Sequence, residues 1–182
     1  MNNFSKAQTL LKLKSLNIPG INIEEIYLFT VDAYLKKSSN IVKEVMDRFS
    51  PKNVIVRSSS VLEDTRYSSM AGKFHSEQGV NTVSHESVRG AINKVIDSYK
   101  THGNWRLNEA LVQPQIERVA VSGVIFTRNI GNNSPYYVIN YDDVTGRTDT
   151  ITKGMEGSTV FIFRHASIPK GSRWHKTIEC AK

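Results

Sequence analysis

The stretch NVIVRSSSVLED, residues 53–64, joins a β-branched apolar run to a dense polar segment. The run before Arg57 predicts a short buried strand, and the three serines after it predict a polar loop. Loops that open from a rigid strand often carry functional side chains. An arginine at such a strand end can make two charge-assisted hydrogen bonds to a phosphate. The alternative is a surface arginine paired with Glu63 or Asp64.

A second polar loop follows in MAGKF, residues 70–74. Gly72 beside Lys73 can bring backbone donors close to a phosphate, although an ordinary turn with a solvated lysine has the same local pattern. The strings GxxxxGK[ST] and GxGxxG are both absent. The sequence therefore contains neither a P-loop nor a Rossmann fingerprint.

Apolar residues at three-and-four spacing predict helices along much of the chain. These segments are 7–16, 30–49 as two helices separated by the polar residues 37–40, 84–99 with Ser84 as N-cap, and 172–182. After residue 103, β-rich runs between turn residues predict strands over 110–113, 119–127, 136–141, 148–152 and 160–164. We expect 136–141 and 148–152 to pair as a hairpin.

The order of these elements predicts an α+β fold with two lobes. Residues 1–103 form a helix-rich lobe that carries the phosphate-binding loops, and residues 104–182 form a β-rich, mostly antiparallel lobe. Because the chain stops inside the last helical segment, we expect it to be a piece of a longer protein, truncated at its C-terminal end.

The composition limits the class of protein. With 182 residues, 39% of them hydrophobic, the chain can bury a core. Its net charge of +7 suits nucleic acid, an anionic membrane or a phosphate-bearing small molecule. The single Cys180 excludes an internal disulfide and favours a reducing, cytoplasmic location. No apolar run approaches the roughly 20 residues that span a bilayer, so no membrane partner is expected.

Other catalytic and metal-binding patterns find little support. The five histidines lack metal-ligand spacing, and no GxSxG string is present. Asp142, Asp143 and Asp149 could hold Mg²⁺, but Asp142 and Asp143 fall in the expected hairpin turn, where aspartates are common for conformational reasons, and we favour that interpretation. From the residues alone we assign no catalytic side chain and no metal ligand.

Three blocks, in order along the chain, resemble a known family. SKAQTLLKLKSLNIP, residues 5–19, resembles an opening GGK-A-x-L-x-x-L block, with Phe4 and Ser5 in place of its two glycines. Residues 54–64 and 69–74 are similar to VRSSA-x-x-ED and SFAGQ strings. VQ at 112–113 and VSGVIFT at 121–127 resemble VQ-x-M and SGVxFT strands. The family is that of phosphoenolpyruvate synthase and pyruvate phosphate dikinase, which has an ATP-grasp fold and includes antibiotic phosphotransferases and a glutamine kinase.

The resemblance implies a role for individual residues. Lys6 and Arg57 would contact the phosphates of ATP, and Gly72 and Ser76 would shape the loop over them. Gln113 would hydrogen-bond near the adenine. A lysine point charge and an arginine fork are suited to neutralising a transferring phosphoryl group. ATP and Mg²⁺ are the implied cofactors.

The chain departs from the family pattern in two places. Asn140 stands where an acidic EA-x-x-GLGE segment would place a glutamate. The later IEF and LQ-x-R strings, which supply metal ligands and a further phosphate arginine, do not occur. The swivelling phosphohistidine domain with its TSHAA-like string is also missing from the sequence.

The resemblance implies an ATP-binding portion of a larger phosphotransferase. The parent enzyme would pass phosphate from ATP through a catalytic histidine in another domain to pyruvate, glutamine or another small acceptor, and the fragment alone is expected to be inactive. YYVINYDD, residues 136–143, favours the glutamine kinase branch. The alternative is a non-catalytic binding module with an acidic partner or RNA, although no nucleic-acid-binding motif is present.

Overall fold

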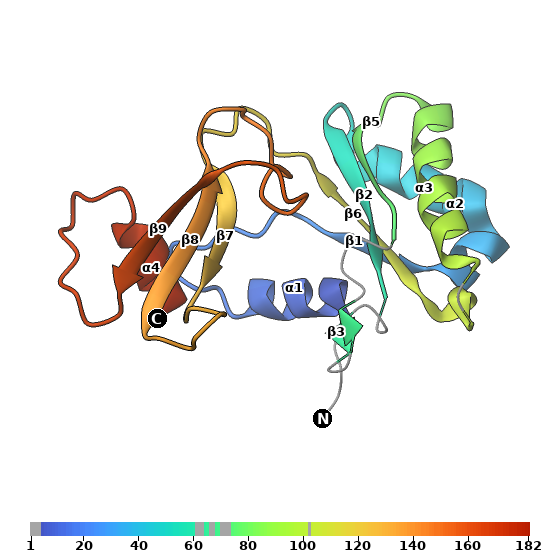
Figure 1. The fold of residues 1–182 in the computed structure, drawn as a ribbon. Coiled ribbons are helices and arrows are strands. Elements are labelled where there is room, and N and C mark those ends of the chain that lie inside the picture. The colour runs from blue at the N-terminus through green and yellow to red at the C-terminus, as the bar shows by residue number, and fades with distance from the viewer. Residues whose placement is uncertain (1–4, 61–63, 66–67, 70–73, 102) are drawn as a thin grey trace. The chain divides into compact units, whose positions relative to one another are not determined.

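The computed structural model describes residues 5–60, 64–65, 68–69, 74–101 and 103–182 (Figure 1). Contacts divide the chain into two compact units, Met1–Asn17 with Asn22–Gln115 and Ile18–Ile21 with Ile116–Lys182. The predicted α+β class with antiparallel sheets is confirmed. None of the described helices is both long and apolar enough to cross a membrane.

The first unit is built on a four-stranded antiparallel sheet with the order β1-β6-β2-β5. Its strands are β1 (Tyr27–Thr30), β2 (Asn53–Ser59), β5 (Ser76–Asn81) and β6 (Glu109–Pro114). Helices α2 (Val31–Phe49) and α3 (His85–Tyr99) cover one face of this sheet (Figure 1). The unit also contains α1 (Lys6–Ser15), the short pair β3 (Asp64–Thr65) and β4 (Ser68–Ser69), and the 3-10 turn η1 (Trp105–Leu107).

Side chains along the central strands β2 and β6 point alternately to the two faces of the sheet. Val54 and Val56 of β2 and Val112 of β6 are fully buried in the core under the helices. The residues between them face the opposite side, because side chains alternate along a strand. β6 lies beyond the lobe boundary expected at residue 103 but pairs within the first unit, so the division into ATP-binding lobes stays a prediction.

The predicted helices of this unit form close to their expected bounds. Ser84 caps α3 by accepting a hydrogen bond from the Ser87 backbone N–H at 3.2 Å, as predicted. α2 is one element with a kink at Lys37, whose φ of −141° and ψ of 46° are not helical. The expected break between two helices is thus confined to one residue, and residues 38–40 continue the helix.

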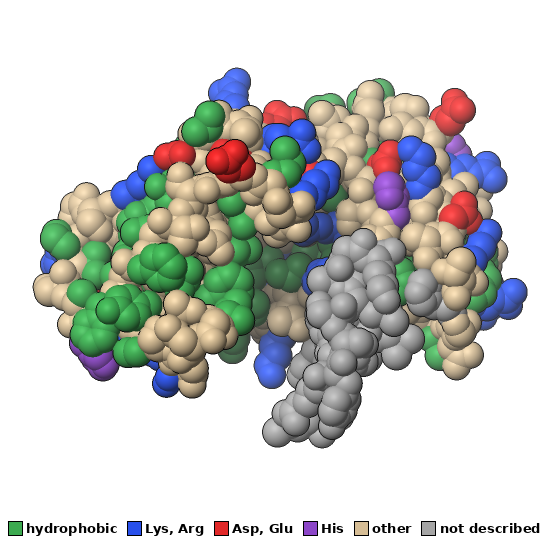
Figure 2. Space-filling model, in the orientation of Figure 1, with side chains coloured by type: hydrophobic (Ala, Val, Ile, Leu, Met, Phe, Trp, Pro, Cys, Tyr) green, Lys and Arg blue, Asp and Glu red, His purple; other side chains and the backbone are tan. Residues whose placement is uncertain are grey.

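The second unit has a three-stranded antiparallel sheet with the order β7-β8-β9. These strands are β7 (Ser122–Phe126), β8 (Tyr136–Asp142) and β9 (Ser158–Phe163). Helix α4 (His175–Ala181) packs on one face through Ile178, which is fully buried against Tyr137 and Ile139. The other face leaves Phe161 and Phe163 exposed, and Figure 2 shows hydrophobic side chains gathered over this sheet at the left of the view.

The prediction that residues 148–152 form a strand paired with β8 is wrong. Those residues form turns, and β8 pairs instead with β7 and β9. The carboxylate of Asp142 accepts hydrogen bonds from the backbone N–H of Val144 and Thr145 and from the hydroxyls of Thr145 and Thr150. These bonds fold the segment back on the end of β8, which prevents it from extending along the strand.

We predict that Gly123→Ala destabilises the second unit by about 1–3 kcal/mol. A Cβ atom at Gly123 would overlap the carbonyl oxygen of Asn140 and lie 3.0 Å from the Cα of Tyr141, so β7 would have to move away from β8. Urea unfolding followed by circular dichroism measures the change. Gly171→Ala is the control in the same unit, because nothing lies within 4 Å of its added Cβ. Equal stability of the two variants would contradict the close approach.

We also predict that the second unit loses stability in acid through Asp142 and Asp149. Hydrogen bonds from Thr145 and Thr150 lower the pKa of Asp142 well below its usual range, and Arg147 and Lys153 lower the pKa of Asp149 to about 2. A lowered folded-state pKa stabilises the protein above the unfolded-state value of about 4, and this contribution is lost as the pH falls towards the folded-state pKa.

Thermal unfolding measured between pH 5 and pH 2 tests this prediction. The melting temperature should fall with pH in the wild type, and it should fall less steeply in Asp142→Asn, which cannot be protonated. Asp47→Asn, on the exposed surface of α2, should keep the wild-type slope. The assignment fails if Asp142→Asn and wild type lose stability in parallel.

Candidate functional site

Helix α1 is attached to the sheet face opposite α2 and α3 by three hydrogen bonds. The backbone N–H of Ala7 donates to the hydroxyl of Ser59 at 3.0 Å. The hydroxyl of Ser5 donates to Glu109 Oε2 at 2.6 Å, and the amide of Gln8 donates to Glu109 Oε1 at 3.1 Å. Residues from β2 and β6 therefore fix the start of a helix that is about 50 to 100 residues distant in sequence.

Three backbone N–H groups in the first turn of α1, those of Ala7, Gln8 and Thr9, already have partners. The Ser5 hydroxyl accepts from Gln8 N–H and the Gln8 side chain accepts from Ser5 N–H, which together form a capping box, and the Ser5 carbonyl accepts from Thr9 N–H. Ala7 N–H is bound to Ser59. Lys6, at the first helical position, thus offers an anion its ammonium group rather than a ring of backbone N–H donors.

Arg57, Ser76 and Gln113 share the sheet face on which α1 docks. Arg57 of β2 lies directly opposite Ser76 of β5 and, on its other side, opposite Leu111 of β6. Gln113 lies two residues beyond Leu111, opposite Ile55. Paired residues of an antiparallel ladder point to the same face. Arg57 and Gln113 are half-buried, whereas Ile55 and Leu111 beside them are buried.

Two buried side chains hold the strand ends near Arg57. The hydroxyl of Tyr99 accepts from the backbone N–H of Ser59 at 2.8 Å and donates to the carbonyl of Glu109 at 2.6 Å. The hydroxyl of Ser60 donates to the Asn108 side chain at 2.8 Å. The serines expected to open a loop are therefore buried, and β2 continues through Ser59.

Sequence reasoning missed the residues that position this face. Ser59, Tyr99 and Glu109 make the contacts just described, but no motif indicates Tyr99 or Glu109 as site residues. The only signal in the sequence was the serine run beside Arg57, which we interpreted as an exposed loop. Gly72, the remaining predicted site residue, lies outside the described residues, and its role stays a prediction.

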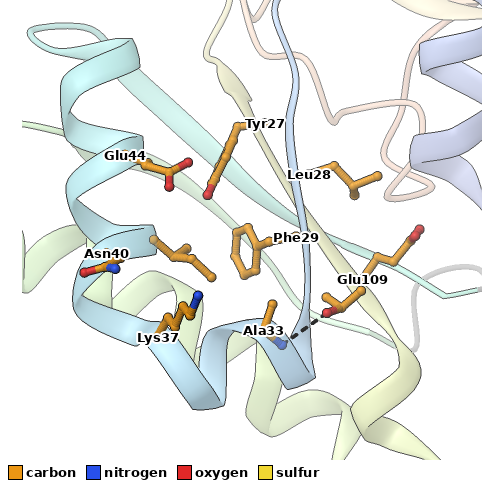
Figure 3. A pocket seen from close by; sticks show the side chains of 10 residues that line it. Tyr27, Leu28, Phe29, Ala33, Lys37, Asn40, Glu44 and Glu109 are labelled. Carbon is orange, nitrogen blue, oxygen red and sulfur yellow. Dashed lines mark hydrogen bonds between the residues drawn. The ribbon is translucent and has the colours of Figure 1, made fainter.

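A cavity of about 520 Å³ lies at the outer edge of the same sheet, between β1 and α2 (Figure 3). Its lining includes Tyr27, Phe29 and Glu44, together with Lys37 at the kink of α2. Burial and a hydrogen bond to Glu44 raise the pKa of Tyr27 to about 12, so its phenol stays protonated at neutral pH. Lys6, Arg57, Ser76 and Gln113 do not line this cavity.

The described residues contain no group of three or more His, Cys, Asp or Glu side chains that could hold a metal ion. Asp142 is bonded to the hydroxyl of Thr150 and Asp149 to the guanidinium of Arg147, both within the turn segment after β8. Asn140, at the position where the resemblance implies a glutamate, accepts a hydrogen bond from the Thr159 hydroxyl of β9 at 2.8 Å. Its amide thus serves to join two strands.

Comparison with known proteins identifies a family for most of the chain. Residues 30–154, more than half of the chain, match the family described as pyruvate phosphate dikinase, AMP/ATP-binding domain. The matched segment includes Arg57, Ser76 and Gln113, and Lys6 precedes it. No curated protein matches the chain. The chain therefore belongs to the pyruvate phosphate dikinase AMP/ATP-binding domain family.

Proposed function

We propose that the sheet face carrying Arg57, Ser76 and Gln113, with Lys6 at the start of the docked α1, binds ATP. The observation that carries this proposal is the pairing of Arg57 with Ser76 on the face that α2 and α3 leave to α1. Within the first unit this places a guanidinium and a hydroxyl side by side on neighbouring strands. The membership of an AMP/ATP-binding family supports the choice of ligand.

Each residue type suits one part of the nucleotide. The Arg57 fork and the Lys6 ammonium would neutralise phosphate oxygens, the first in a bidentate manner and the second as a point charge. Ser76 would donate a hydroxyl beside Arg57. Ile55 and Leu111 are buried within the unit, and Gln113, half-buried opposite Ile55, would present its amide to the adenine edge.

We further propose that the domain belongs to a larger cytoplasmic phosphotransferase. Its phosphate would pass from ATP through a catalytic histidine in another domain to pyruvate, glutamine or another small acceptor, with the glutamine kinase branch favoured by residues 136–143. Mg²⁺ is expected to accompany ATP. The described residues offer no set of three ligands for it, and no step is assigned to the ion.

The rival function is a non-catalytic module that binds an acidic partner. Asn140 favours it, because its amide cannot replace a carboxylate as an anionic metal ligand, and the net charge of +7 would attract an acidic surface. The two functions differ in what they require of Arg57. A nucleotide site depends on its fork geometry, whereas a diffuse basic surface depends on total charge alone.

We predict that Arg57→Ala lowers the affinity for ATP at least about tenfold, because hydrogen bonds to charged groups contribute about 1.5–3 kcal/mol each. Isothermal titration calorimetry of the whole chain with ATP and Mg²⁺ at low ionic strength is the measurement. Arg57→Lys should recover little of the affinity, since a point charge cannot make two parallel bonds.

Lys43→Ala is the matched control for this experiment. It removes the same charge from the exposed surface of α2, on the other side of the sheet, and should leave ATP binding unchanged. If Arg57→Ala and Lys43→Ala weaken binding equally, the basic surface of the rival function explains the interaction. If the wild type shows no binding at millimolar ATP, the proposed site is wrong.

We predict that Glu109→Ala releases α1 and weakens ATP binding through Lys6. The change removes the acceptor of both Ser5 and Gln8, so the backbone amides of α1 should exchange with deuterium roughly tenfold faster or more. Hydrogen exchange followed by mass spectrometry measures this effect. Glu25→Ala, which removes an exposed ion pair with Arg48, should leave α1 protected. Unchanged exchange in Glu109→Ala would show that these bonds do not fix the helix.

A further inference from the structure

A second cavity, of about 260 Å³, lies in the second unit between the edge strand β7 and helix α4. In the register of the sheet, Gly123 of β7 is paired with Tyr141 of β8. Gly123 lies in the wall of the cavity, where β7 approaches the backbone of Asn140 and Tyr141 closely. Arg173 and Trp174, which directly precede α4, and Thr177 of α4 enclose the hollow from the other side.

Aromatic rings form one wall of this cavity. The rings of Tyr141 and Trp174 meet edge to face, with centroids 4.7 Å apart and planes at 62°. Ile125 and Ile139 add apolar surface. A cavity of about 150 Å³ is enough to hold benzene in an apolar interior. The hollow beside Gly123 is therefore of a size to take two fused aromatic rings.

Arg173 gives the cavity a polar, directional rim. Its guanidinium carbon lies 5.1 Å from the centroid of Tyr141 and 5.1 Å from that of Trp174. Nη1 donates to Asp143 at 2.8 Å, which fixes the group in place and balances its charge. A guanidinium carries five N–H donors in a rigid fork. A ligand that carries an acceptor at the edge of its rings can therefore accept a hydrogen bond from the Arg173 guanidinium, which stacks on Tyr141 and Trp174.

We propose that this cavity binds a flat, fused two-ring aromatic molecule that presents a carboxylate or carbonyl oxygen to Arg173. The rings lie against Tyr141 and Trp174, and the oxygen accepts a hydrogen bond from the guanidinium. The cavity contains none of the residues assigned to ATP, so this proposal does not depend on the function proposed above.

The two tryptophans provide a probe and a control within the same protein. Trp174 lines the cavity, while Trp105 packs against the core of the first unit. The ¹⁵N-labelled whole chain is titrated with 2-naphthoate, and the two indole N–H signals are followed by NMR after assignment with Trp105→Phe. We expect a saturable shift of the Trp174 signal and a constant Trp105 signal. No shift at millimolar 2-naphthoate, or equal shifts of both signals, would overturn the proposal.

Variants separate the apolar and polar parts of the interaction. Thr177→Phe fills the cavity and should abolish the shift, while an unchanged dispersion of the amide spectrum shows that the chain still folds. Arg173→Met keeps the aliphatic stem but removes the donors, and should weaken binding about tenfold. Arg164→Met is the matched control, because Arg164 stacks over Tyr137, 5.6 Å from its centroid, away from the cavity.

Two further outcomes decide the assignment. Binding by Arg173→Met with wild-type affinity would overturn the role of the guanidinium, and binding by Thr177→Phe would overturn the location. The titration is also repeated with saturating ATP. We expect the Trp174 shift to persist, and competition by ATP would show that the cavity is not a separate site.

Discussion

The hydroxyl of Tyr99 joins the two central strands of the first unit at the point where their polar side chains begin. It accepts from Ser59 of β2 and donates to Glu109 of β6, and the residue itself ends α3 and is fully buried. The same two residues, through their side chains, hold the first turn of α1. A single buried group thus sets the spacing of the strands that carry Arg57 and Gln113 and the anchorage of the helix that carries Lys6.

The sequence best predicts the elements that carry a whole apolar pattern and its end signals within one segment. α3 has a serine cap and an unbroken apolar stripe, and it begins and ends as expected. β1 has only four residues and runs directly into the cap of α2, which left no separate signal. β5 reads SEQGVN and has no alternating pattern; it is a strand because β2 pairs with it. The hairpin expected after β8 failed because Asp142 captures Thr145 and Thr150, a local competition that β-propensity does not describe.

The residues of the candidate site also differ in how far the sequence alone predicts them. Arg57 could be selected from its strand-end position, but the residues alone left open whether it was a surface charge, and the resemblance was needed to prefer a phosphate ligand. Lys6 had no local signal at all. Its place on the sheet depends on Ser59 and Glu109, which are distant in sequence. Hydrogen bonds between segments so far apart produce no short motif in the sequence. Sequence patterns could therefore suggest the phosphate-binding side chains but not the residues that hold them in place.

The exposed face of the second unit makes the protein prone to associate at high concentration. β9, residues STVFIF, lies at the edge of its sheet, contains no charged residue and no proline, and exposes Phe161 and Phe163. Such a segment is a template for strand pairing between molecules at high concentration. Arg164 follows it directly and acts as a charged gatekeeper. Buffer of low ionic strength, which leaves the net charge of +7 little screened, should therefore keep concentrated protein dispersed better than buffer of high salt.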